Sequence, residues 1–205
     1  ELLSAITDRY GGTVLIVAAR KGHTELCVTL LSSLPQADRL KLILVNKRTA
    51  LHSAATLGDT ETVSGILNCL DADQQLQLLF TQDNDGNTAL HYGAWQGHTE
   101  IVKTLLGNLT SYQRLKLLFT QDKGGDGDTA LHKAAQWGHT EIVKTLLDNL
   151  TPEQQLKLLS LKNKEGMTAA GHYTNSDTMR TLEHYQKEAD YGVNYRMFCN
   201  IYLEF

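Results

Sequence analysis

The tetrapeptide Thr-Ala-Leu-His occurs three times, at Thr49–His52, Thr88–His91 and Thr129–His132. The segment from Thr129 to Leu147 reads T-A-L-H-K-A-A-Q-W-G-H-T-E-I-V-K-T-L-L, and the segment from Thr88 to Leu106 differs from it at only four positions. Similarity at a fixed period is the signature of stacked repeats, in which each unit buries its apolar face against its neighbours. The sequence therefore predicts an elongated solenoid.

Two weaker copies flank these three, a looser one from Thr13 (T-V-L-I-V-A-A-R-K-G-H-T-E-L) and an eroded one from Thr168 (T-A-A-G-H-Y). Successive opening threonines are 36, 39, 41 and 39 residues apart. The string resembles the ankyrin repeat, whose signature is D-x-x-G-x-T-P-L-H-x-A-A-x-x-G-H-x-E-I-V-x-x-L-L, with alanine here where that family usually has proline. The resemblance covers residues 1–182 and implies an all-α ankyrin-repeat solenoid of five units, the last one degenerate.

Each unit is predicted to contain two short helices. The opening threonine is a good N-cap for the first helix, because its hydroxyl can accept a hydrogen bond from the first turn. In the fourth copy we expect Gly138 to end that helix in the left-handed conformation and Thr140 to cap the second helix. Both helices are shorter than the roughly 12 to 15 residues at which an isolated helix becomes marginally stable. Stacking between repeats must therefore supply the stability.

The additional residues beyond the usual ankyrin period of about 33 carry a repeated motif of their own. It reads D-A-D-Q-Q-L-Q-L-L from Asp71, T-S-Y-Q-R-L-K-L-L from Thr110 and T-P-E-Q-Q-L-K-L-L from Thr151. A capping residue followed three positions later by glutamine has the spacing of a capping box, and Pro152 stands at the first helical position. We expect a short third helix per repeat, followed by an extended finger loop with turn residues such as D-N-D-G-N.

Bulk composition argues against several functional classes. The net charge is -4, with 19 basic and 23 acidic residues, and provides no basic stripe for nucleic acid. Three cysteines with unrelated spacing suggest a reducing, cytoplasmic compartment, and no apolar run approaches the roughly 20 residues needed to cross a membrane. Because the chain begins with Glu1, in a segment like the end of a preceding repeat, we expect it to be a piece of a longer protein.

Neither catalysis nor a metal or cofactor is expected. Six of the eight histidines fall in repeat slots, three in T-A-L-H and three in G-H-T-E. The ankyrin resemblance implies that the first of these bonds near its own threonine and that the second ties adjacent loops. The motifs of nucleotide, zinc-protease and esterase sites do not occur. The stretch G-G-D-G-D from Gly124 to Asp128 lacks the final acidic residue of the calcium-binding nonapeptide, because Thr129 stands there.

The candidate binding residues lie in two repeat slots before the glycine and on the finger tips. The ankyrin resemblance implies that these slots line the concave groove that binds partners, and both tryptophans of the chain occupy them. Tryptophan, tyrosine and arginine are enriched in interface hot spots. The alternative interpretation is that both rings pack on neighbouring repeats. The expected partner-contacting residues are Trp95, Trp137, Tyr92, Arg20, Lys21, Leu57, Gln96, Gln136, Asn84, Asp85 and Asp126, with Asp128 as a further finger-tip residue.

Residues 183–205 form a separate segment that is rich in aromatic residues. A solenoid needs a cover on the outer face of its last repeat, so we expect a capping segment packed on the fifth unit. The alternative is a tail that contacts another domain or another copy of the parent protein.

The sequence therefore predicts a non-catalytic module that binds a protein partner through the concave groove and the finger loops. No small-molecule substrate, nucleic acid or membrane insertion is expected. Two alternatives remain open. The array could be a structural or regulatory arm of a larger channel or multidomain enzyme that contacts its own chain, or a microbial effector that acts on host proteins in the host cytoplasm.

Overall fold

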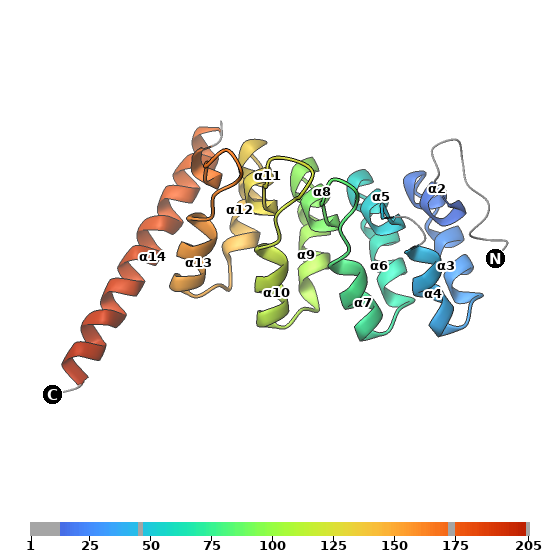
Figure 1. Ribbon diagram of the computed structural model, residues 1–205, viewed down its shortest axis with the longest axis horizontal. Coiled ribbons are helices and arrows are strands. Elements are labelled where there is room, and N and C mark those ends of the chain that lie inside the picture. Colours follow the sequence, from blue (N-terminus) through green and yellow to red (C-terminus); the bar gives the residue numbers. More distant parts are fainter. Residues whose placement is uncertain (1–12, 45–46, 172–174, 204–205) are drawn as a thin grey trace.

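The computed structural model describes residues 13–44, 47–171 and 175–203, with the side chains of residues 195–203 left undescribed. Four units, each of three helices, lie side by side between the two ends of the molecule (Figure 1). The first helices are α2 (Val14–Arg20), α5 (Ala50–Leu57), α8 (Ala89–Gln96) and α11 (Ala130–Gln136). The second helices are α3 (Thr24–Ser32), α6 (Thr60–Asn68), α9 (Thr99–Gly107) and α12 (Thr140–Leu147). The third helices are α4 (Gln36–Ile43), α7 (Ala72–Leu79), α10 (Ser111–Leu118) and α13 (Pro152–Leu159).

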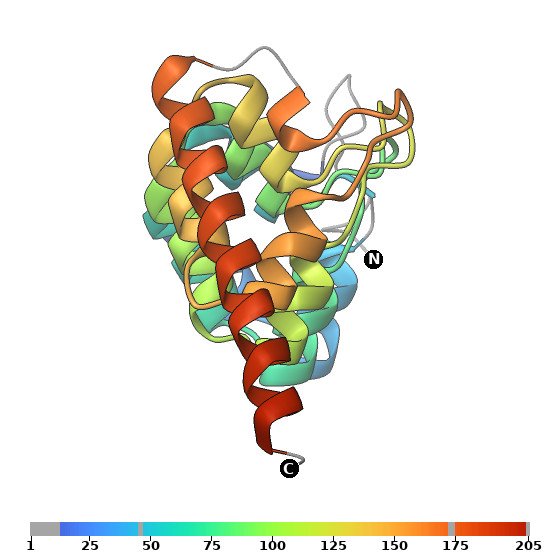
Figure 2. The same ribbon diagram turned by 90° about the vertical axis from the view of Figure 1, so that its left-hand side faces the viewer.

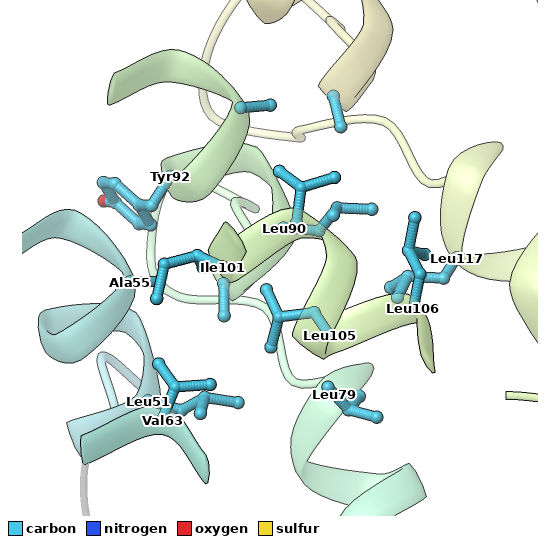
Figure 3. Packing of buried hydrophobic residues seen from close by; sticks show 14 of the residues in the cluster. Leu51, Ala55, Val63, Leu79, Leu90, Tyr92, Ile101, Leu105, Leu106 and Leu117 are labelled. Atoms are coloured by element: carbon cyan, nitrogen blue, oxygen red, sulfur yellow. The ribbon is translucent and has the colours of Figure 1, made fainter. Parts of the chain in front are cut away.

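Equivalent helices of successive units pack against each other: α2 on α5, α5 on α8 and α8 on α11, with a second row of α3, α6, α9 and α12. Fully buried alanines such as Ala54, Ala94 and Ala134 allow the first helices to approach closely. Leucine, isoleucine and valine from the second helices fill the space behind them, and Figure 3 shows Ile101 and Leu105 of α9 among these buried side chains. Each fully buried leucine contributes about 1.5 to 3 kcal/mol, so the interface between units supplies what the short helices lack.

The histidines have the two structural roles that the resemblance implied. His52 Nδ1 accepts a hydrogen bond from Thr49 N (3.1 Å), and its Nε2 lies 3.0 Å from Asn87 O in the next unit. The second histidine of the motif bonds backward, because His139 Nε2 lies 3.0 Å from Trp95 O in the preceding unit. The third and fourth units, which carry both repeat histidines, are thus tied to both of their neighbours by imidazole groups.

The predicted end of the first helix is confirmed, whereas the predicted start of the second is wrong. Gly138 has φ +72, the left-handed conformation expected after the last helical turn. Thr140 does not cap the second helix but is its first residue, and the N-cap position belongs to His139. The Thr140 hydroxyl instead forms a hydrogen bond with the hydroxyl of Thr178 in the next unit, with the two oxygens 2.7 Å apart. The Thr140 hydroxyl, which the sequence predicted to cap the second helix, therefore forms a contact between repeats instead.

The third helix of each repeat is confirmed. The capping box is complete in α13, where Gln154 N donates to Thr151 Oγ1 (3.3 Å) and Thr151 N donates to Gln154 Oε1 (2.9 Å). The glutamine at the next position bonds to the second helix of the same repeat: Gln155 Nε2 donates to Leu147 O, at the end of α12, at 3.1 Å. The third helix therefore satisfies the exposed end of the second helix in its own repeat.

The finger loops project together from one side of the stack (Figure 2). Gln82 Nε2 donates to Gly86 O within its own finger (2.6 Å) and to Gln121 O of the next finger (3.0 Å). Gly86 is required here, since it has φ +81 and a Cβ would lie 2.1 Å from the backbone nitrogen of Lys123. The fingers are therefore bonded to each other and not only to their own helices.

The fifth unit departs from the pattern, and no break in its last helix marks the boundary expected after residue 182. Its first helix shrinks to the 3-10 turn η1 (Ala169–Gly171), in which Gly171 replaces the repeat histidine. The long helix α14 (Ser176–Leu203) then takes the place of the second helix and continues across residue 182 without interruption. It packs on α12 and α13 and crosses the end of the stack (Figure 2).

Part of the aromatic segment does cover the last repeat. Tyr185 packs against the core, and its hydroxyl donates to Asp148 Oδ1 at 2.5 Å. At Gly192 a Cβ would lie 2.8 Å from the Pro152 ring, which shows how closely α14 approaches α13. Tyr191, by contrast, is exposed, and the remaining aromatic side chains of the segment lie outside the described residues.

Candidate protein-binding surface

Three large hydrophobic side chains are exposed in the slots just before the repeat glycine. Leu57 is 49%, Trp95 is 38% and Trp137 is 56% exposed. Leu57 ends α5, Trp95 lies in α8, and Trp137 is the C-cap residue that follows α11. The two indole rings lie next to each other, with centroids 6.3 Å apart and planes inclined at 47°. We call these three residues the tryptophan surface. The rings are therefore not sealed beneath neighbouring repeats.

Tyr92, also expected to contact a partner, lies beneath this surface and is buried, unlike the two tryptophans. It is 5% exposed, and its hydroxyl donates to Asp83 Oδ2 at 2.7 Å. Burial and this hydrogen bond raise the pKa of Tyr92 far above its ordinary value, so the phenol stays protonated as the donor. Its ring stacks on Trp95 at 6.1 Å and is labelled among the buried side chains in Figure 3. Tyr92 supports Trp95 and holds the finger that begins at Asp83.

A pocket of about 370 Å³ opens between the two tryptophans and two neighbouring fingers. Of the predicted binding residues it brings together five, namely Asp85, Tyr92, Trp95, Gln136 and Trp137. We call it the tryptophan pocket. The other predicted residues are exposed but do not line it; these are Arg20, Lys21, Leu57, Asn84, Gln96 and Asp126.

A buried ion cluster lies beneath the finger loop that begins at Asp122 and precedes α11. Lys133 Nζ lies 3.1 Å from Asp122 Oδ2 and 3.0 Å from Asp128 Oδ2, and both carboxylates are buried. Asp128 is therefore not the finger-tip residue that the sequence suggested. Burial alone would raise the pKa of Asp128, but hydrogen bonds from Asn163 and Lys133 outweigh it and hold that pKa below its ordinary value. The same carboxylates hold the pKa of Lys133 above its ordinary value in spite of burial.

Sequence reasoning missed Lys133 and Asp122 as parts of the site, although a signal was present. Lys133 occupies the repeat slot of Tyr92, and Asp122 opens its finger as Asp83 opens the preceding one. In both units the helix side chain therefore holds the first acidic residue of a finger. Comparing equivalent slots between repeats would have paired these residues.

Among the residues that the structure describes, no group of three or more His, Cys, Asp or Glu side chains could hold a metal ion. None of the helices in the same part of the chain is both long and apolar enough to span a membrane.

Comparisons with known proteins bear on the repeats themselves. Residues 15–116 and 108–194 match the family model described as ankyrin repeats (3 copies). A comparison with curated proteins found no match. The two matched stretches together cover most of the chain and extend over the helix triplets of the described residues, from α2 to α13. With its repeated helix pairs, finger loops and histidine links, the chain belongs to the ankyrin-repeat family.

Proposed function

We propose that this chain is a non-catalytic binding module that holds a protein partner on the tryptophan surface and on the adjacent finger loops. Ankyrin repeats are generally protein–protein interaction modules and are typically non-catalytic. The observation that carries the proposal is the exposure of Leu57, Trp95 and Trp137 in the two slots before the repeat glycine of three consecutive units. Neighbouring exposed apolar side chains with a polar rim are typical of interaction sites.

The chemistry of these residues fits a protein interface. Tryptophan combines a large apolar area with one hydrogen-bond donor and loses little rotamer freedom on binding. The rim is polar, since Gln96, Gln136 and Asp85 are exposed beside the rings. The surface is also built on packed helices and mutually bonded fingers, so little ordering is needed when a partner docks.

The test is quantitative capture of partners by the immobilised chain, the Trp95→Ala/Trp137→Ala variant and a matched control, Tyr112→Ala. Tyr112 is 76% exposed on α10 and does not line the tryptophan pocket. A hot-spot tryptophan contributes about 2 kcal/mol, or roughly 30-fold in affinity. We expect the double variant to lose the partner while the control retains it. Equal capture by all three proteins, with unchanged far-UV circular dichroism, would refute the proposal.

A further inference from the structure

We infer that the tryptophan pocket receives an arginine side chain of the partner, an inference that rests on the proposed function. The pocket volume of about 370 Å³ is near the lower end of the range for small-ligand sites. A single long side chain fits such a space, whereas a helix or a strand does not. Its walls combine aromatic faces with carboxylates, which is the chemistry that attracts an organic cation.

The chain itself already places a guanidinium group on the same row of rings. Arg48 Cζ lies 4.9 Å from the centroid of the Tyr92 ring. Tyr92 stacks on Trp95, and Trp95 lies beside Trp137, so the three rings form a continuous row. Within the described residues no cation lies over either indole ring. The row therefore accepts a guanidinium at one end and leaves its exposed end available for a second one.

The charge of the pocket also favours a cation. Its walls contain Asp85 and Asp122 against one lysine, Lys133. That ammonium group is shared with a further carboxylate, Asp128, so its charge is more than balanced. Three other lysines, Lys123, Lys162 and Lys164, line a neighbouring hollow of about 560 Å³. The ammonium group of Lys164 is held there by the carbonyl oxygens of Lys123 (2.7 Å) and Gly125 (2.8 Å).

Asp85 is the carboxylate placed to pair with the incoming side chain. It is exposed, and its carboxylate makes no hydrogen bond or ion pair with the rest of the described chain. Its backbone, however, is fixed on both sides, because Asp85 N donates to Asp83 Oδ1 (3.0 Å) and Gly124 N donates to Asp85 O (2.7 Å). A fixed backbone with an unpaired acidic group is ready to receive a cation without reordering the loop.

Arginine suits this site better than lysine. Its planar guanidinium can stack on an indole face while its fork of N–H groups binds a carboxylate, and it is more weakly hydrated than an ammonium. Lysine can supply the charge but not the stacking plane. The inference therefore distinguishes between the two basic side chains.

Three peptides of the form acetyl-Gly-Gly-Xaa-Gly-Gly-amide test it, with arginine, lysine or the neutral isostere citrulline at Xaa. Binding is followed by NMR titration of the two tryptophan indole N–H signals. The arginine peptide should shift both signals in a saturable way and bind about tenfold more tightly than the citrulline peptide. Asp85→Asn should weaken it about two- to fivefold. Asp73→Asn, which removes an exposed carboxylate on α7, should leave it unchanged.

The outcomes separate this inference from the proposed function. Equal binding of the arginine and citrulline peptides, or of the wild type and Asp85→Asn, overturns the arginine pocket. Lysine binding as tight as arginine overturns the stacking argument. In either case loss of the protein partner from Trp95→Ala/Trp137→Ala still supports the binding surface. Conversely, arginine binding with undiminished partner capture by that double variant supports the pocket and refutes the proposed function.

Discussion

Buried His91 makes the stability of the central repeats depend on pH in a way that can be worked out from its contacts. Its Nδ1 accepts from Thr88 N (3.2 Å), and its Nε2 lies 3.2 Å from Asp128 O. Nδ1 must therefore be unprotonated, and Nε2–H donates to the carbonyl. A second proton would direct an N–H group at another N–H donor inside the core. Burial lowers the pKa of His91 to about 4, although Asp122 and the carbonyl of Asp128 oppose the shift.

The sign and the magnitude follow from linkage. Because the folded pKa lies below the unfolded value of 6.5, only the unfolded chain binds the proton between the two values. Folding stability is therefore unaffected above pH 6.5, falls as the pH drops toward 4, and reaches a floor below it. The slope is about 1.4 kcal/mol per pH unit. Between pH 7.5 and pH 5.0 the His91 contribution should therefore fall by about 2 kcal/mol.

The assay is urea unfolding of the wild type and His91→Gln at these two pH values, followed by tryptophan fluorescence. Trp95 is on the same helix as His91 and Trp137 is in the next unit, so the probe reports on the repeats concerned. Glutamine does not titrate, and at pH 7.5 it should cost about 1 to 3 kcal/mol through poorer hydrogen bonding. That deficit should shrink by about 2 kcal/mol at pH 5.0.

A matched control is His184→Gln, since the His184 side chain is exposed and unfolding changes its surroundings little. Other groups that titrate in this range affect all three proteins equally, so their contributions cancel when the free energies of unfolding are subtracted. If the wild type and His91→Gln lose stability in parallel between the two pH values, the buried neutral imidazole is refuted.

Two further perturbations test the ion cluster and the terminal helix by urea unfolding. Lys133→Met should destabilise the chain by about 3 to 5 kcal/mol, because it leaves two buried carboxylates without their cation, whereas Lys144→Met breaks only an exposed pair and should change stability by less than about 1 kcal/mol. A loss below about 1 kcal/mol for Lys133→Met would contradict the buried cluster. Gly192→Ala places a methyl group 2.8 Å from the Pro152 ring and should cost about 1 to 3 kcal/mol. Gly107→Ala meets no atom within 4 Å and should stabilise its helix by up to about 1 kcal/mol. Equal effects of the two alanines would show that α14 does not press on α13.

The fold was largely predictable from sequence because its signals are local and repeated. The first helices follow from threonine caps and the third helices from a capping residue with glutamine three positions later, as at Thr151 and Gln154. The predicted cap at Thr140 failed because its hydroxyl binds a threonine of the next unit instead. The boundary expected after residue 182 has no counterpart in the helix itself. The chain continues there with Leu182, Tyr185 and Ala189 at helical spacing and without a capping residue, so the helix does not stop.

The candidate site was less predictable, because burial there depends on neighbouring units. The repeat slots correctly indicated that Trp95 and Trp137 would be exposed. Its position in the repeat could not show that Tyr92 is buried, because the groups that bury it are the Trp95 ring and the Asp83 carboxylate of a finger loop. The sequence suggested that Asp128 is an exposed loop residue, but it is buried in an ion pair with Lys133 of α11. Pattern within one repeat predicts which face a residue occupies, but contacts between repeats decide whether it is accessible.

The two buried helix-to-finger links explain why the tryptophan pocket can be preformed. Tyr92 holds the finger that begins at Asp83, and Lys133 holds the finger that begins at Asp122. These pairs differ in chemistry, a neutral hydrogen bond in one unit and an ion pair in the next, yet both attach the first residue of a finger to the helix beneath it. Fingers that moved independently would have to be ordered on binding, at a cost of about 1 to 2 kcal/mol for each residue fixed. Fixing them during folding leaves more of the contact energy available for the partner.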